Sequence, residues 1–168
     1  MVKSIEDYRV KGTIKDIAPN EKQAYLTFLE ETYNDNLNVS EFLLIKFPRW
    51  SIISGYYAMH DISKLLLAKR YNMKISKPET HTSVIVALRE LIKRKEIISL
   101  IEKAEEEYIE IVSLHLSLLK GKEEREKSQY YTSSLIKPAV KIEKAAYFME
   151  KLVKPYIKII KNLMKNDN

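Results

Sequence analysis

Cysteine is absent from the 168 residues of this chain, and glycine and proline are scarce, with three and five residues respectively. Without cysteine the chain forms neither a disulfide framework nor a thiolate nucleophile. The scarcity of glycine and proline, beside an abundance of Lys, Glu, Ile and Leu, favours long helices over a strand-and-turn architecture. Only two glutamines occur, a bias that is typical of thermophilic proteins.

Membrane-directing segments are also missing. No basic-then-apolar signal opens the chain, and no uncharged run approaches the roughly 18 residues that span a bilayer. We therefore expect a soluble, cytoplasmic protein without a membrane partner.

The motifs of the familiar enzyme classes are missing too. The chain has no phosphate-binding glycine loop, no Gly-x-Ser-x-Gly and no paired acidic motif on a strand. Its three histidines, His60, His81 and His115, fall on apolar helix faces, and Tyr57 stands where a di-iron Glu-x-x-His motif has its glutamate. We interpret them as three separate core or edge histidines, with convergence on a metal as the alternative. We expect no metal and no cofactor.

The rest of the chain is organised around the stretch Trp50–Arg70, whose apolar residues cover almost the whole circumference of a helix. Such a helix lies in the middle of a fold. Gly55 permits a close approach of helices, so we favour a dimer seam for part of the aromatic cluster on this helix, over a ligand box or packed core. That cluster consists of Trp50, Tyr56, Tyr57 and Met59.

Further helices are expected to surround this one. Residues 34–40 are typical of a turn, 10–17 of a short extended arm, and Gly121 of a helix end or kink. Together these features predict an all-α fold, an antiparallel up-and-down bundle of four to five long helices, as a single domain over residues 1–168. The remaining helices are expected at 21–35, 42–47, 79–94, 96–120 and 134–166.

Positive charge is concentrated in the last helix. Residues 134–168 hold eight lysines against three acidic residues, which is +5 of the net charge of +6. The lysines follow one another at intervals of three, four or seven, so they form one basic flank. Such a flank either tracks the phosphates of a nucleic acid or is the solvated face of a lysine-rich protein. Its members are Lys137, Lys141, Lys144, Lys151, Lys154, Lys158, Lys161 and Lys165.

Three stretches together resemble the HEPN superfamily, the helical domain named for its nucleotide-binding members in higher eukaryotes and prokaryotes. GYYAMHDISKLLLAKR (55–70) is similar to the second helix of that family. KPETHTSVIVALREL (77–91) places a Thr-His pair at the start of the next helix, as many prokaryotic members do. EEREKSQYYT (123–132) stands where the family has its Arg-x(4–6)-His motif, and the opening stretch 10–24 resembles archaeal members.

The resemblance implies a homodimer in which the motif's Arg and His cleave RNA without a metal. Arg125 matches the first position of the motif, whereas Tyr130 and Tyr131 occupy the position of the histidine, and Glu126 replaces a polar residue. A tyrosine has an ordinary pKa of about 10 and is therefore a poor general base at neutral pH. The resemblance also implies a small nucleotidyltransferase as partner in a toxin–antitoxin-like pair.

Our leading hypothesis is a catalytically degenerate HEPN-like dimer. It would bind RNA, a nucleotide or a partner protein through the Arg125–Tyr131 region and the lysine flank. The first alternative is an active, metal-independent endoribonuclease that uses Arg125 with Tyr130 or Tyr131. The second alternative is a structural helical adaptor without a ligand.

Overall fold

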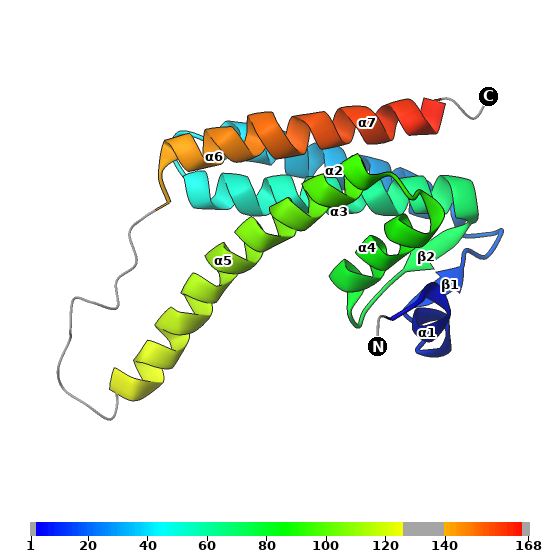
Figure 1. Cartoon of the computed structure of the whole chain (residues 1–168), viewed down its shortest axis with the longest axis horizontal. Helices are drawn as coiled ribbons and strands as arrows, with labels where there is room; N and C mark the ends of the chain where they lie inside the picture. The colour runs from blue at the N-terminus through cyan, green and yellow to red at the C-terminus, as the bar shows by residue number, and fades with distance from the viewer. Residues whose placement is uncertain (1–2, 126–139, 166–168) are drawn as a thin grey trace.

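The computed structural model describes residues 3–125 and 140–165, with side chains described up to residue 112 and again from residue 140. These residues are predominantly α-helical, with one small two-stranded sheet (Figure 1). Among them, no helix is both long enough and apolar enough to cross a membrane. The elements are α1 (Ile5–Val10), β1 (Ile14–Asp16), α2 (Lys22–Leu43), α3 (Pro48–Tyr71), β2 (Met73–Ile75), α4 (Thr80–Leu91), α5 (Lys95–Arg125), α6 (Ile142–Phe148), the π-helical turn η2 (Met149–Val153) and α7 (Lys154–Lys165).

Helix α3 lies at the centre of the fold, as its sequence predicts. It begins with Pro48 in its first turn, where the missing N–H costs nothing, and it ends at Asn72 in a left-handed conformation with φ of 54°. It contacts α2, α4, α5, α6, η2, α7 and β2. Buried side chains therefore lie on every side of α3, and they include Ile52, Tyr56, Met59, Ile62, Leu65, Leu66 and Leu67.

The turn expected at residues 34–40 is absent, because α2 continues through this stretch. Its polar residues find partners on α3 instead of in a local turn. The Asn36 amide donates to the Asp61 carboxylate at 3.1 Å, and the Ser40 hydroxyl donates to the Ser51 carbonyl at 2.6 Å. These tertiary contacts outweigh the local preference of Asn, Asp and Ser for turns.

The extended arm near the N-terminus forms β1, and its partner is a strand that the sequence did not reveal. β2 lies between α3 and α4. The two strands are antiparallel, with Ile14 opposite Ile75 and Asp16 opposite Met73. The side chains of Ile14, Met73 and Ile75 are buried, so this short sheet closes one end of the core.

Two expectations for the later helices are wrong. Helix α5 passes through Gly121 and continues to Arg125, because a single glycine costs only about 1 kcal/mol inside a helix with strong helix formers on both sides. The last helix is not one regular helix, since the π-helical turn η2 interrupts it. There the Lys154 N–H donates to the Met149 carbonyl, five residues back.

Gly55 lies where α3 meets both α2 and η2. A Cβ on Gly55 would lie 3.0 Å from Ser40 Oγ, 3.0 Å from Val153 Cγ2 and 3.2 Å from Met149 Sδ. The close approach expected of Gly55 therefore takes place within one chain.

Only part of the aromatic cluster on α3 remains available for the dimer seam that was expected there. Tyr56 and Met59 are completely buried in the core of the single chain, so neither is available to a second copy. Trp50 is 54 % exposed and Tyr57 is half-buried.

Replacing Gly55 with alanine tests this junction. We expect Gly55→Ala to lower the free energy of unfolding by about 1–3 kcal/mol, because three neighbours on two elements would have to move. Ser54→Ala, at the next and half-buried position, is the matched control and should change it by less than about 0.5 kcal/mol. Denaturant unfolding measures both. An increase in stability for Gly55→Ala, as for alanine in an uncrowded helix, would contradict the junction.

Candidate functional site

The lysines of the last helical segment do not form one continuous flank, because their neighbours differ before and after η2. Lys144, on α6, is paired with Glu107 at 2.8 Å and with Glu110 at 3.0 Å, both on α5. Partial burial alone lowers the pKa of Lys144, but the two carboxylates outweigh it and raise this pKa above its usual value. The charge of Lys144 is thus compensated within the chain.

The π-helical turn explains why the series divides. A π-helical turn contains more residues than an α-helical turn, so the residues after η2 point in a different direction from the one that a 3.6-residue period predicts. Lys144, before η2, therefore contacts α5, whereas the lysines of α7 border α2. Lys141 and Lys151 are exposed and take no part in either arrangement.

The lysines of α7 line a groove of about 340 Å³ along α2, which we call the α2–α7 groove. Figure 1 shows α7 running beside α2 on one side of the molecule. Lys161 also lies over the ring of Tyr33 on α2, with its Nζ 5.5 Å from the ring centroid, a cation–π contact that orients this lysine. The groove is lined by Leu37, Lys154, Ile157, Lys158, Lys161, Asn162 and Lys165.

The positive charge of the groove is only partly compensated. Lys154 is hydrogen-bonded to Glu150 and lies 4.0 Å from Glu41. Lys158, Lys161 and Lys165 make no ion pair with any residue that the structure describes. Three lysines of one helix face therefore leave their charge available to an anion.

The predicted site residues are brought together only in part. Of the six lysines predicted to contact phosphate, Lys154 and Lys158 line the groove, and Lys161 and Lys165 of the same flank join them. Lys137, Tyr130 and Tyr131 lie outside the described residues, and Arg125 is described only as the last residue of α5. Asn162 was missed, although its position four residues after Lys158 places it on the same helix face.

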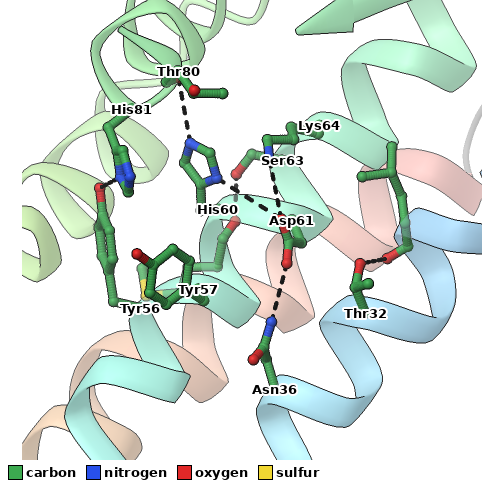
Figure 2. Close-up of polar contacts among 12 residues, drawn as sticks. Thr32, Asn36, Tyr56, Tyr57, His60, Asp61, Ser63, Lys64, Thr80 and His81 are labelled. Atoms are coloured by element: carbon green, nitrogen blue, oxygen red, sulfur yellow. Dashed lines mark hydrogen bonds and ion pairs between the residues drawn. The ribbon is translucent and has the colours of Figure 1, made fainter. Parts of the chain in front are cut away.

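A second cluster of polar side chains lies on the opposite side of α3, and it corrects the interpretation of three separate histidines. His60 on α3 and His81 on α4 stack with their ring centroids 4.6 Å apart. The Tyr56 hydroxyl lies 2.8 Å from His81 Nδ1, and His60 Nε2 lies 3.4 Å from the Thr80 carbonyl (Figure 2). The side chain of His115 lies outside the described residues.

Tyrosines extend this histidine stack onto α5. The ring of Tyr108 stacks on Tyr56 with centroids 4.4 Å apart, and its hydroxyl lies 3.0 Å from that of Tyr57. The stack therefore fastens α4 and α5 to α3. Helical periodicity does not predict this arrangement, because it describes one helix at a time and does not reveal which helix faces meet.

The titration of the stack favours a packing role. Burial lowers the pKa of His81 to about 4 and lowers that of His60, so both imidazoles are neutral at pH 7. Burial raises the pKa of Tyr108 to about 12 and also raises that of Tyr56. Groups that keep one protonation state around neutral pH are poorly suited to general acid–base catalysis.

Asp61 carries the charge that lies next to this stack. Burial raises the pKa of Asp61, but His60 and Lys64 together outweigh it and hold this pKa below its usual value. The carboxylate is 3.2 Å from Lys64 Nζ and 3.9 Å from His60 Nδ1, and it also accepts the bond from Asn36. Among the described residues, no group of three or more histidine, cysteine or acidic side chains is arranged to hold a metal ion.

No protein-family model, no curated protein and no solved structure matches this chain. The HEPN resemblance therefore stays a prediction, and the candidate site depends on the geometry of the chain itself. By that geometry the α2–α7 groove is the candidate binding site, and the histidine stack is a structural element.

The histidine stack predicts a loss of stability in mild acid. In the unfolded chain histidine takes up a proton near pH 6.5, whereas folded His81 does so only near pH 4. The unfolded state thus binds more protons between these values, and the free energy of unfolding falls as the pH is lowered from 6.5 to 4. His81→Phe, which keeps an aromatic ring, should reduce this fall by about 1–3 kcal/mol.

Denaturant unfolding of both proteins at pH 7, 5.5 and 4.5 measures the difference. Both proteins have the same carboxylates, so the loss of stability that comes from protonating these carboxylates cancels in the difference between the two proteins. An equal loss of stability in the two proteins would show that His81 is not held neutral.

Proposed function

We propose that this protein binds single-stranded RNA through the α2–α7 groove, as a catalytically degenerate HEPN-like protein. The observation that carries the proposal is the row of lysines on α7 without acidic partners among the described residues. Lysine side chains contact phosphates as point charges, and they supply affinity without reading the base sequence. The Asn162 amide offers a hydrogen-bond donor and an acceptor in the same groove.

The length of the row favours an oligonucleotide over a mononucleotide. Lys158 and Lys165, the first and last of the uncompensated lysines, are seven residues apart on α7, which is about 10 Å at 1.5 Å per residue. A strand with stacked bases carries one phosphate per roughly 3.4 Å, so such a row faces several phosphates at once. Half-buried Leu37 adds apolar surface on the α2 side.

The proposal includes a homodimer and a nucleotidyltransferase partner in a toxin–antitoxin-like pair, which the resemblance implies. It also includes a cytoplasmic location and an up-and-down bundle of four to five long helices, which the composition and the helical pattern of the sequence favour. Partner binding in place of RNA binding, and a structural adaptor without a ligand, are the competing outcomes. The binding measurements below distinguish RNA binding from both.

Binding should weaken steeply as salt increases. For single strands the logarithm of the affinity falls by about 0.7 per phosphate contact for each unit in the logarithm of salt concentration. The triple variant Lys158→Gln, Lys161→Gln, Lys165→Gln should bind an unstructured RNA more weakly, with a salt slope shallower by about 2.

The matched control is the triple variant Lys103→Gln, Lys141→Gln, Lys151→Gln. This control variant has the same net charge as the groove variant, but its substitutions lie at exposed positions outside the groove. Fluorescence anisotropy at several salt concentrations measures both triple variants. Equal weakening in the two would assign the binding to net charge alone, and no binding at low salt would favour the adaptor.

Incubation with RNA in the presence of EDTA separates binding from catalysis. Because Tyr130 and Tyr131 stand where the family has a histidine, we expect structured and unstructured RNAs to remain intact for hours. Cleavage that persists in EDTA and is lost in Arg125→Ala would instead establish the metal-independent endoribonuclease. A gel assay with both proteins is sufficient.

A further inference from the structure

The connection between α2 and α3 exposes more apolar surface than a turn in water usually does. Residues 42–50, which we call the α2–α3 tip, have the sequence FLLIKFPRW. Phe42 is 80 % exposed, Ile45 70 %, Phe47 56 % and Trp50 54 %. Single exposed apolar residues are ordinary, but four large ones within nine residues indicate a surface that contacts something other than water.

These exposed side chains lie at the junction of α2 and α3, at one end of these two helices. Figure 1 shows the junction of α2 and α3 at the end opposite α1 and the sheet, beside the start of α6. Helix α6 adds Ile142 and Tyr147, which are 43 % and 59 % exposed. The walls of a groove cover the side chains that line it. The exposures of Phe42 and Ile45, 80 % and 70 %, therefore indicate that these two side chains stand out from the surface.

The charges at the tip have one sign. Residues 42–50 contain Lys46 and Arg49 and no acidic residue. The guanidinium of Arg49 lies 5.8 Å from the centroid of the Trp50 ring, and its Nε has no hydrogen-bond partner within the described part of the chain. The neighbouring Glu41 lies 4.0 Å from Lys154, which compensates its charge.

Part of the backbone of the tip is hydrogen-bonded internally. The N–H groups of Leu44, Phe47 and Trp50 donate to the carbonyls of Glu41, Leu43 and Phe47, and Pro48 has no N–H to satisfy. Each internal hydrogen bond removes a polar group that would otherwise need water, which favours contact with an apolar surface.

We propose that the α2–α3 tip inserts into the headgroup region of an anionic lipid bilayer. Tryptophan and phenylalanine favour the boundary between water and acyl chains, and Lys46 and Arg49 complement anionic headgroups. A bilayer accommodates projecting side chains of any outline, whereas a protein partner needs a matching pocket for each. The expectation of no membrane partner came from the lack of a spanning segment, and surface insertion needs none.

Trp50 reports on the tip directly, because it is the only tryptophan of the chain. We expect its emission to shift to the blue when vesicles of phosphatidylglycerol and phosphatidylcholine are added, and to be quenched by brominated acyl chains. Vesicles of phosphatidylcholine alone should give a weaker response, and Lys46→Gln, Arg49→Gln should remove this difference between the two kinds of vesicle.

Two apolar substitutions at the tip test the insertion. Phe42→Ser, Ile45→Ser should lower the vesicle partition coefficient by about tenfold or more, because burial of each side chain contributes over 1 kcal/mol. Phe28→Ser is the matched control, because Phe28 lies on the same helix and is 58 % exposed but is far from the tip in sequence. Its partition coefficient should stay within about twofold of the parent value.

Three outcomes would overturn the proposal. The first is co-sedimentation with anionic vesicles without a change in Trp50 emission, which the α2–α7 groove alone would produce. The second is a blue shift that depends on protein concentration without lipid, which would assign the tip to contact with a second copy. The third is an equal loss of partitioning in the Phe28→Ser control.

Discussion

The contact at Gly55 is the constraint on which the arrangement of the other helices depends. Because Gly55 has no side chain, Ser40 of α2 and Met149 and Val153 of η2 reach the backbone of α3. Ser40 and Ser51 lock α2 to α3 beside it, since each hydroxyl donates to the carbonyl of the other residue, at 2.6 and 2.7 Å. Met149 and Val153 both belong to the π-helical turn, so this contact lies at the point where the period of the last helix changes.

That change of helical period separates two kinds of lysine. Before η2, Lys144 is used inside the chain to attach α6 to α5 through Glu107 and Glu110. After η2, the lysines of α7 border α2, and three of them keep an uncompensated charge within the described part of the chain. On the other side of α3, the histidine stack fastens α4 and α5 with groups that stay neutral at pH 7. Packing and binding are thus assigned to different sides of the same central helix.

The sequence is sufficient to predict the parts of this structure that depend on one helix at a time. The central position of α3 follows from apolar residues on all of its sides, and the extended arm follows from alternation near Ile14. Features that depend on two elements meeting were missed or mistaken. The stretch 34–40 is helical because Asn36 and Ser40 find partners on α3, and His60 and His81 are 21 residues apart in sequence but stack in space. The prediction of one lysine flank assumed a regular α-helix with 3.6 residues per turn, and η2 interrupts that period.

The most direct test of the account is to observe the individual lysines while RNA binds. Lysine side chains labelled with ¹³C-methyl groups give separate NMR signals, which single Lys→Arg variants assign. On titration with a short unstructured RNA, the account predicts shifts for Lys158, Lys161 and Lys165 and unchanged signals for Lys141 and Lys144. Shifts of Lys141 and Lys144 together with the α7 lysines would restore a single continuous flank and contradict the division of the lysines at η2.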